Sequence, residues 1–488
     1  MRVLLIQPRF TLEHDIPLVV QPPLGLCYLA AVAREAGHEP TVLDCLAAGW
    51  DRVRRQGSRA TYGIDDDEAV GRATRLRPAV IGISVPFTIQ YPNARSLCQR
   101  LRAALPDATI VMGGMHATVD PAGVLACDAV DYVVRGEAEH SFTSLLGLIE
   151  RGEDVTAVDG LCYRDPRGVP VIRGKERFIE DLDALPFPAW DLLDLPRYWR
   201  AGLVHGFNLR GRRSLPLVSS RGCPALCSFC TIHSAWGRRF RARSPADILE
   251  EIDLLERRFG VDHLQFEDDN LTYDMPRAKE LFRGMACREK AIPWNTPNGV
   301  ALWRMDRECL DLMSAAGCYY VSFGLESASQ RVLTDLIRKP LDLSRVLPLI
   351  PYARGLGMKV CLFFVVGTPG ERQDELQASF DLPYRVAVDW VEYSVATPYR
   401  GTALLDEVLD AGQLREDRAA LPYARRASID TPEFTAEWLE DMIRAENRRY
   451  IRYLLRRRPR TFFSQGWQVV RVNPRFVFTY LRRLFLGS

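Results

Sequence analysis

The stretch Arg221-Gly222-Cys223-Pro224-Ala225-Leu226-Cys227-Ser228-Phe229-Cys230 decides how the rest of the chain is interpreted. It places three of the chain's twelve cysteines within eight residues, in the spacing Cys-x3-Cys-x2-Cys. Thiols this close in sequence pair poorly as disulfides, but the loop between them lets three sulfurs converge on one soft metal centre. The spacing therefore predicts that Cys223, Cys227 and Cys230 are metal ligands. If the metal centre is a four-iron cluster, three thiolates leave one iron open for another ligand.

Zinc is the competing metal, with His233 as a fourth ligand in a Cys3His set. We favour the iron cluster because zinc fingers normally separate their ligand pairs by a longer loop. A cysteine trio without any metal is the third interpretation. The other nine cysteines are scattered singly, which excludes a disulfide scaffold.

Length and composition are those of a large globular protein. The 488 residues suggest about three domains, and 26% charged with 47% hydrophobic residues excludes long disorder. A formal net charge of +2 excludes a general polyanion binder. The N-terminal apolar run is too short for a signal peptide, and no stretch approaches the roughly 18 apolar residues of a spanning helix, so we expect a cytoplasmic protein.

The first 150 residues alternate apolar runs with amphipathic segments. The pattern predicts strands at Arg2-Gln7, Pro40-Cys45, Ala79-Val85, Thr109-Met112 and Asp131-Val134, with helices at Leu24-Ala36, Asn93-Leu105 and Ser141-Arg151. Such alternation indicates parallel strands joined by right-handed crossovers, and hence an open doubly wound, Rossmann-like sheet.

Small and polar residues follow the predicted strands of this sheet. Ser84 follows the third strand, Gly113 and Gly114 the fourth, and Glu137 the fifth. Ligands of doubly wound sheets bind beyond the carboxyl ends of the strands, and glycines there let a bulky ligand approach the backbone. From this segment alone, turn residues in an empty Rossmann-like module are an equal alternative.

The cysteine loop, with the aromatic Phe229 before its last cysteine, resembles the cluster loop of radical S-adenosylmethionine (SAM) enzymes. The resemblance implies a partial (β/α)6 TIM-type barrel, whose chemistry lies at strand carboxyl ends. After a first strand at 217–220, its further strands are found at His263-Glu267, Ile292-Trp294, Tyr319-Phe323, Lys359-Val366 and Trp390-Ala396.

The same resemblance implies a SAM site built from the loops after these strands. Gly324, Glu326 and Ser327 correspond to the family's segment that holds the amino and ribose groups of SAM. Gly367 and Phe229 join them as cofactor-binding residues.

A sheet domain followed by such a barrel resembles the cobalamin-binding class of radical SAM enzymes over residues 1 to 405. It implies that Ser84, Gly113, Gly114 and Glu137 line a cobalamin site. No Asp-x-His-x-x-Gly occurs in the chain, so no histidine is marked as a lower cobalt ligand, and His116 is expected to line the site. An accessible low-valent cobalt suits methyl transfer.

The resemblance implies an enzyme with a [4Fe-4S] cluster, SAM and cobalamin, and an electron donor such as flavodoxin or ferredoxin. The function it favours is a C-methyltransferase that acts on an unactivated carbon of a small metabolite or natural-product intermediate, through a 5′-deoxyadenosyl radical and methylcobalamin. A non-methylating cyclisation, ring contraction or oxidation with the same cofactors is the alternative. A zinc or cobalamin sensor is a third hypothesis, and a methylthiotransferase lacks a second cysteine trio.

The substrate-facing candidates lie at the predicted barrel mouth. Asp268 and Asp269 end the second strand, and Tyr399 follows the sixth, so we predict catalytic roles for these three residues. An acidic turn that caps the next helix is an equal interpretation of the aspartates. The tyrosine is slightly more often a packing residue.

The predicted domains are a cobalamin-binding domain at 1–150, a hairpin and linker at 151–212, the barrel at 213–405 and a helical, Arg-rich region at 406–488. From Asn447 to Ser488 there are eleven Arg and no acidic residue. We expect the apolar face of this segment to dock on the barrel, with weak contact to a membrane surface as the alternative and no nucleic acid as partner.

Overall fold

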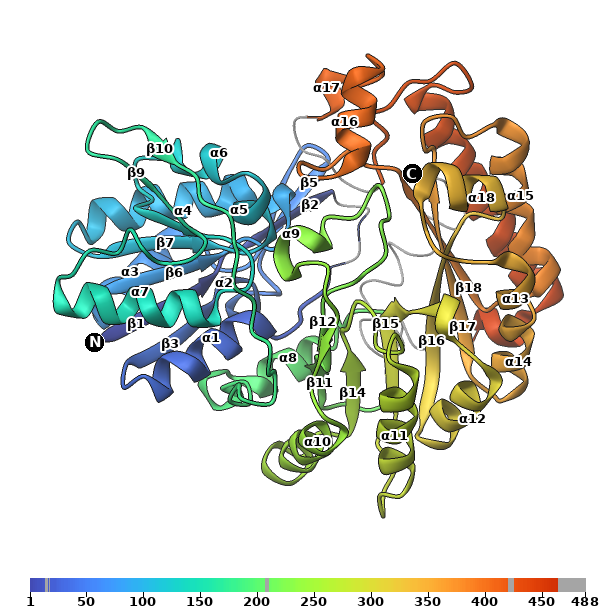
Figure 1. The fold of residues 1–488 in the computed structure, drawn as a ribbon, viewed down its shortest axis with the longest axis horizontal. Helices are drawn as coiled ribbons and strands as arrows, with labels where there is room; N and C mark the ends of the chain where they lie inside the picture. The colour runs from blue at the N-terminus through green and yellow to red at the C-terminus, as the bar shows by residue number, and fades with distance from the viewer. Residues whose placement is uncertain (14–15, 17, 207–209, 420–424, 464–488) are drawn as a thin grey trace. The chain divides into compact units, whose positions relative to one another are not determined.

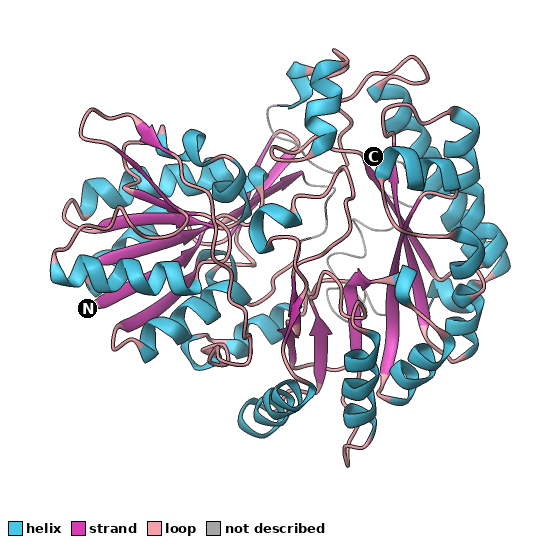
Figure 2. Ribbon diagram, viewed as in Figure 1, coloured by secondary structure: helices cyan, strands magenta, loops and turns pink. Residues whose placement is uncertain are grey.

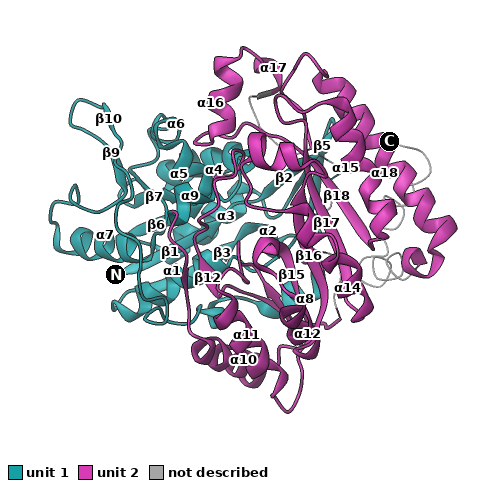
Figure 3. Cartoon of the chain, turned by 45° about the vertical axis from the view of Figure 1, so that its right-hand side comes forward, with its two compact units in different colours: residues 1–201, 232–237 teal, residues 202–231, 238–488 magenta. Residues whose placement is uncertain are grey.

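The structure, a computed structural model, describes residues 1–13, 16, 18–206, 210–419 and 425–463. The chain forms two compact units, coloured separately in Figure 3. Unit 1 comprises residues 1–201 and 232–237, and unit 2 comprises residues 202–231 and 238–488. The segment that follows the third cysteine of the loop therefore belongs to unit 1, whereas the loop itself belongs to unit 2.

The core of unit 1 is a seven-stranded sheet in the order β10-β9-β8-β7-β6-β1-β3 (Figure 1). Its strands are β1 (Arg2–Gln7), β3 (Glu39–Asp44), β6 (Val80–Ser84), β7 (Thr109–Gly113), β8 (Tyr132–Val134), β9 (Leu161–Arg164) and β10 (Pro170–Val171). Neighbours from β3 to β8 are parallel, whereas β9 and β10 add an antiparallel hairpin. The predicted doubly wound sheet is confirmed. Its winding direction changes between β1 and β6, which is the switch point where ligands of such sheets bind.

Helices cover both faces of this sheet (Figure 2) because strand residues on both faces are apolar. On one face, α1 (Leu24–Glu35) and α7 (Glu139–Arg151) pack against Val3 and Leu5 of β1. On the other face, α3 (Asp66–Leu76) and α4 (Tyr91–Ala104) pack against its Leu4 and Ile6. The smaller elements of unit 1 are β2 (Phe10–Glu13), α2 (Cys45–Ala48), β4 (Val53–Gln56), β5 (Arg59–Tyr62), η1 (Thr88–Gln90), α5 (Met115–Val119), α6 (Pro121–Leu125), η2 (Trp190–Leu192), α8 (Leu195–Ala201) and α9 (Ile232–Trp236).

Asp44 is a buried carboxylate at the end of β3. Its Oδ1 accepts a hydrogen bond from the backbone N of Ala47 (3.0 Å), and its Oδ2 accepts one from the hydroxyl of Tyr198 (2.8 Å). Burial raises the pKa of Asp44 to about 6, although these hydrogen bonds oppose the shift. The native state therefore holds this proton more tightly than the unfolded chain does.

We expect unit 1 to become less stable as the pH rises and Asp44 loses this proton. The contribution is fully present below about pH 4 and is lost as pH rises through about 6, with an upper bound of about 3 kcal/mol. Thermal unfolding at a series of pH values should show this loss, and Asp44→Asn should flatten that part of the profile. Asp67→Asn, at a carboxylate whose side chain is 83% exposed, is the matched control. An Asp44→Asn profile as steep as that of Asp67→Asn would contradict the assignment.

Unit 2 is built on a six-stranded sheet in the order β11-β14-β15-β16-β17-β18, with every neighbouring pair parallel (Figure 1). The strands are β11 (Ser214–Leu217), β14 (His263–Phe266), β15 (Trp294–Val300), β16 (Cys318–Glu326), β17 (Lys359–Val366) and β18 (Trp390–Val395). Intervening helices are α10 (Pro245–Phe259), α11 (Met275–Ala286), α12 (Arg307–Ala315), α13 (Leu343–Val346), α14 (Leu349–Gly355) and α15 (Gln373–Val386). Short elements are β12 (Ser220–Arg221), β13 (Arg241–Ala242), η3 (Leu302–Arg304) and the π-helix η4 (Val332–Ile337). Strand order and connections are those of the predicted partial barrel.

Two strand predictions in unit 2 were misplaced. The first strand occupies Ser214–Leu217, whereas 217–220 was predicted. The third was predicted at Ile292-Trp294 and is found at Trp294–Val300. Pro297 and Gly299 are typical of turns, but here they lie in a strand whose pairing with β16 has register shifts.

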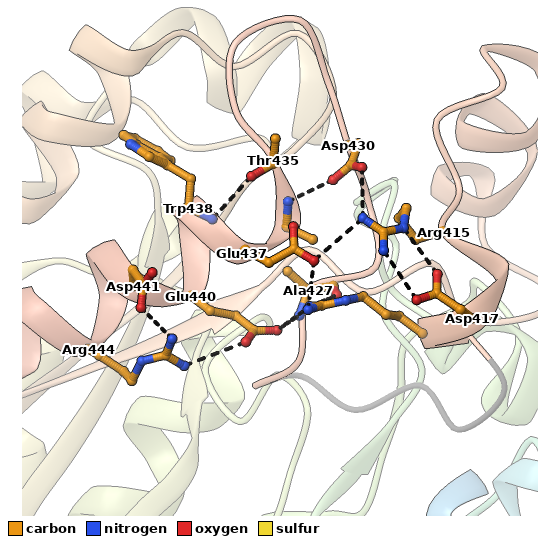
Figure 4. A network of polar contacts seen from close by, with 12 residues as sticks. Arg415, Asp417, Ala427, Asp430, Thr435, Glu437, Trp438, Glu440, Asp441 and Arg444 are labelled. Carbon is orange, nitrogen blue, oxygen red and sulfur yellow. Dashed lines mark hydrogen bonds and ion pairs between the residues drawn. The ribbon is translucent and has the colours of Figure 1, made fainter. Parts of the chain in front are cut away.

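The C-terminal region of unit 2 contains α16 (Ala403–Asp410), α17 (Glu416–Ala419) and α18 (Ala436–Arg457). Figure 4 shows the polar network that joins the segment before α18 to that helix. Its ion pairs link Arg415 to Asp430 (3.2 Å) and Arg418 to Glu440 (2.9 Å). Exposed pairs contribute little singly, but a network of several orders the segment.

Helix α18 docks on the barrel through apolar and aromatic side chains. Tyr450 is buried and donates a hydrogen bond to the backbone O of Val388 (2.7 Å). Arg449 pairs with Asp381 of α15 (3.0 Å) at the surface. The part of the Arg-rich tail after residue 463, including its predicted membrane contact, lies outside the described residues. None of the described helices has the length and apolar character needed to cross a membrane.

Candidate functional site

The cysteine loop follows β12 and is anchored by its own backbone. Ser228 is buried and donates from its backbone N to the O of Ile337 (2.9 Å), and from its hydroxyl to the O of Leu336 (3.0 Å), both in η4. Its own O accepts from the N of Leu404 in α16 (2.9 Å). Phe229 packs at the edge of a small apolar cluster that includes Leu404. These three hydrogen bonds anchor the loop through Ser228 and do not involve a cysteine sulfur.

Two thiols of the loop interact with polar groups from other segments of unit 2. Cys223 is buried and hydrogen-bonds the side chain of Asn270, which follows β14. Burial raises the pKa of Cys227 to about 11, against the positive charge of Lys339. A bound metal centre supplies the positive charge that thiolates in such surroundings need, so a soft metal centre suits this donor set.

A site for a single metal ion would need several ligands around one point. Across the described ranges, no three His, Cys, Asp or Glu side chains are arranged to hold one metal ion. In a four-iron cluster the three thiolates bind three different irons, so that convergence on one ion is not required. His233, the predicted fourth ligand of the zinc alternative, lies in α9 of unit 1.

Glu326 ends β16 in a strained conformation beside a buried lysine. Its φ is +69°, and its carboxylate Oε1 lies 2.6 Å from the Nζ of Lys339. Lys339 also donates to the backbone O of Gly324 (2.6 Å), and its Nζ lies 5.5 Å from the ring centroid of Trp303. A Cβ on Gly324 would lie 2.7 Å from Glu326 Oε1, so a larger residue there would displace the carboxylate end of the pair.

Lys339 is a residue that the sequence analysis missed. It is 8% exposed, and it interacts electrostatically with both Cys227 and Cys223. The sequence carried one usable signal, because only five of the chain's 64 basic residues are lysine and this one closely follows the predicted SAM segment. Nothing in the local sequence showed that the chain folds back and places the ammonium group of Lys339 at the end of β16.

Ser327 and Gly367 lie at the same end of the sheet. Ser327 is buried, and its hydroxyl accepts from the N of Ser329 (3.1 Å). Gly367 has φ +81°, and a Cβ on it would lie 2.2 Å from a methyl of Leu439. Its N donates to Glu371 (2.8 Å), whose burial raises the pKa of that carboxyl to about 8. Both residues shape the loops, and their contact with a cofactor stays a prediction.

The two predicted catalytic aspartates have different surroundings. Asp268 is buried, and its carboxylate accepts from the hydroxyls of Ser219 (2.7 Å) and Ser220 (2.6 Å), which tie it to the start of the cysteine loop. Asp269 is half-buried and hydrogen-bonds no residue in the described part of unit 2. Burial, with the charges of Asp268 and Glu267, raises the pKa of Asp269 to about 7. Asp269 is thus the carboxylate with oxygens left for a ligand.

Tyr399 follows β18 in a turn that leads into α16. Its backbone O accepts from the hydroxyl of Thr402 (2.6 Å), and Thr402 caps the helix by accepting from the N of Leu405 (3.3 Å). The Tyr399 side chain is half-buried. Its catalytic role stays a prediction.

In unit 1, Ser84, Gly113 and Gly114 meet at the carboxyl ends of β6 and β7. Ser84 pairs with Gly113 in register, and the N of Val85 donates to the O of Gly113 (2.9 Å). Gly114 has φ +94°, and a Cβ on it would lie 2.8 Å from backbone atoms of Val85. The edge beside the switch point is therefore side-chain-free at two consecutive residues, which suits a large flat ligand such as a corrin.

Glu137 and His116 are buried near this edge. Glu137 Oε2 accepts from the backbone N of Ile179 (2.7 Å), so this carboxylate ties the linker to the sheet. The ring of His116 lies 4.4 Å from that of Tyr91, and its Nδ1 lies 3.3 Å from the hydroxyl of Thr88. Both arrangements are compatible with lining roles, which stay predictions.

The chain matches two known domain families. Residues 18–146 match the B12 binding domain, and residues 217–382 match the radical SAM superfamily. The first match contains β3, β6, β7 and β8 of the unit 1 sheet, and the second contains β14, β15, β16 and β17 of the unit 2 sheet.

Relatives of known activity share both regions. Cytidylyl-2-hydroxyethylphosphonate methyltransferase of Streptomyces wedmorensis is 37% identical over 441 residues, which cover 84% of this chain and 82% of that protein. Hopanoid C-3 methylase of Methylococcus capsulatus is 26% identical over 82% of this chain and 71% of that protein. Anaerobic magnesium-protoporphyrin IX monomethyl ester cyclase of Rubrivivax gelatinosus is 26% identical over 84% of this chain and 70% of that protein.

Two solved structures share the fold. OxsB with aqua-cobalamin and SAM bound superposes with a TM-score of 0.72 at 15% identity, covering 99% of this chain and 75% of that one. TsrM of Kitasatospora setae with cobalamin and a [4Fe-4S] cluster bound gives 0.67 at 19% identity, covering 84% of this chain and 75% of that one.

Proposed function

Because the chain belongs to the cobalamin-dependent radical SAM methyltransferases, we propose that it is a C-methyltransferase that acts on an unactivated carbon of a small metabolite. The [4Fe-4S] cluster, SAM and cobalamin, when bound, supply an electron, a hydrogen-abstracting radical and a transferable methyl group. The observation that carries the proposal is the buried Lys339–Glu326 pair beside Cys227, at the strand ends of the barrel. It provides both charges needed to hold an amino acid.

The roles proposed for this chain's residues follow from their surroundings. Cys223, Cys227 and Cys230 hold the cluster. Glu326 and Lys339 hold the ammonium and carboxylate of SAM, whose two charges match theirs. Positioning is the main requirement, because a carbon radical abstracts hydrogen from almost any group within reach.

Asp269 is the proposed substrate contact at the barrel mouth. Its carboxylate is half-buried, and Asp268 beside it is already engaged by the hydroxyls of Ser219 and Ser220. Asp268 is therefore assigned a positioning role, in which it fixes the start of the cysteine loop relative to β14. Asp269 Oδ atoms accept from a hydroxyl or an ammonium of the substrate.

A second candidate function has support from one comparison. By their names, the magnesium-protoporphyrin ester cyclases close a ring, and one of them is similar over 84% of this chain. The relative at 37% identity is a methyltransferase by name, and so is the hopanoid methylase. Methyl transfer is therefore the preferred outcome. The name of the first relative further supports an acceptor that carries a phosphonate or phosphate.

The experiment that separates the two functions does not require the substrate. Reduced enzyme loaded with cluster and cobalamin is mixed with SAM, and both SAM-derived products are measured in a single turnover. A methyltransferase forms S-adenosylhomocysteine in amounts equal to its bound cobalamin. Formation of 5′-deoxyadenosine alone, without S-adenosylhomocysteine, would contradict the proposal. Enzymes of this superfamily need a reductant, and we propose flavodoxin or ferredoxin for this one.

Neutralising the Lys339–Glu326 pair should weaken SAM binding at least about tenfold, because both charge-assisted contacts are lost. Removing Lys339 alone leaves a buried carboxylate unpaired and destabilises the fold, so the decisive variant is the double substitution Lys339→Gln with Glu326→Gln. Calorimetric titration with SAM measures the affinity. Lys279→Gln, at a surface ion pair of α11, is the control. Unchanged SAM affinity in the double variant would show that the pair does not bind SAM.

A further inference from the structure

A basic pocket lies in unit 2 beside the cysteine loop. It has a volume of about 590 Å³ and is lined, among others, by Pro224, Arg238, Arg239, Phe240, Tyr273 and Arg304. These residues come from the cysteine loop, from the segment before β13 and from the segments after β14 and β15. The volume lies within the range of small-molecule sites.

Two arginines in the wall of this pocket are not paired with a carboxylate that the structure describes. Among the residues that the structure describes, neither Arg238 nor Arg304 forms an ion pair with a carboxylate. Arg304 is held in place instead by Tyr273, because its Nε donates to the backbone O (3.4 Å) and its guanidinium lies 5.4 Å from the ring centroid. The one acidic side chain of the wall, Asp274, accepts from the N of Arg277 (3.2 Å) as the cap of α11. Guanidinium groups set in this way favour a phosphate or phosphonate.

The same pocket is lined by two aromatic side chains. The rings of Phe240 and Tyr273 lie 4.9 Å apart at an interplanar angle of 47°, and both side chains are half-buried. A planar base of any kind can stack against these rings, because every base has a π-face. Arginines beside aromatic rings are thus suited to an anion that carries a base.

The pocket borders the residues proposed to hold the cluster and SAM. Pro224 follows Cys223 directly, and Arg304 follows Trp303, whose ring faces Lys339. SAM itself does not suit the pocket, because its sulfonium and ammonium outweigh its carboxylate and the arginines would repel it. A different, anionic molecule is expected there.

We propose that this pocket binds the phosphoryl or phosphonyl group and the attached base of the methyl acceptor, which is therefore a nucleotide-like anion. The inference rests on the proposed methyltransferase function and specifies its substrate class. The anionic end is held by Arg238 and Arg304 at the rim, and the carbon to be methylated extends from it toward the barrel mouth.

Binding of nucleoside monophosphates tests the inference without turnover. Enzyme loaded with cluster and cobalamin, without SAM, is titrated calorimetrically with CMP, UMP, AMP and GMP, and with cytidine as the uncharged probe. We expect at least one monophosphate to bind with a Kd below about 5 mM, and cytidine to bind at least about tenfold more weakly than CMP. The double variant Arg238→Gln with Arg304→Gln should weaken monophosphate binding at least about tenfold.

The control is Arg257→Gln, which removes a surface guanidinium whose side chain is 77% exposed. It should bind the monophosphates as the unaltered chain does, and thermal unfolding of all variants verifies their folding. No binding of any monophosphate, or equal binding by the double variant, would overturn the inference. So would a double variant that binds nucleotides normally but accepts electrons more slowly from flavodoxin than from dithionite, because the pocket would then dock an acidic protein. The S-adenosylhomocysteine assay is independent, so a failure of the proposed function is distinguished from a failure of the pocket.

Discussion

Replacing Cys227 with alanine should abolish the reductive cleavage of SAM and leave the fold intact. The loss is complete because a cluster that lacks one of three thiolates is not retained in a form that can bind SAM and pass an electron to it. The fold survives because the loop is held by Ser228, through its backbone and hydroxyl bonds to Ile337, Leu336 and Leu404, and not by the cysteine sulfur. The measurement is 5′-deoxyadenosine formation by anaerobically reconstituted protein, together with iron and sulfide per chain.

The chain offers a matched control for this variant. Cys287 caps the end of α11 and is exposed, so Cys287→Ala should keep the iron content and the SAM cleavage of the unaltered protein. If Cys227→Ala cleaved SAM as Cys287→Ala does, the cluster assignment would be wrong. Equal loss in both variants would point to a general effect of removing cysteine on reconstitution.

The second large effect is expected at Gly114, where alanine should lower bound cobalamin at least about tenfold. A Cβ there would lie 2.8 Å from backbone atoms of Val85, so the ends of β6 and β7 must separate, and the residue would also hold a left-handed φ of +94°. Backbone strain of this kind costs about 1–3 kcal/mol, enough for the expected loss. Cobalt per chain and the visible spectrum after reconstitution measure the effect.

Strain and steric clash can be separated with a second glycine of unit 1. Gly168, in the hairpin turn between β9 and β10, has φ +81°, and a Cβ on it would meet no atom within 4 Å. Gly168→Ala therefore introduces similar backbone strain without a clash, and it should retain cobalamin. Full cobalamin binding by Gly114→Ala would place the corrin elsewhere.

The predictable part of the fold was the part governed by periodic patterns. Parallel strands buried on both faces are near-continuous apolar runs, as in β1 and β17. The predicted first and last residues of both strands agree with those in the structure. The third barrel strand was misplaced because Asn295, Pro297 and Gly299 have the composition of a turn. Asn295 pairs with both neighbouring strands and Val300 pairs with β16, so that β15 continues across Pro297 and Gly299. Propensity is a weak guide where tertiary contacts decide.

The candidate site divides in the same way. The cysteine trio is a local feature, and its spacing alone indicated the metal centre. Asp268 and Asp269 are adjacent in the sequence and could not be ranked there, because what distinguishes them is the pair of serine hydroxyls from another strand end that occupy Asp268. Lys339 was missed for the same reason, since its partner Glu326 lies thirteen residues away and meets it only after η4 turns the chain back.

The amino-acid sequence by itself determined the order of sheet and barrel, the three thiols and the glycines at the strand ends, because each depends on spacing along a few consecutive residues. Only the tertiary structure decided which charges are paired and which face open space. Burial and ion pairing depend on atoms brought together from separate strands and loops. That is why the arginines beside the cysteine loop became a candidate anion site only when their surroundings were known.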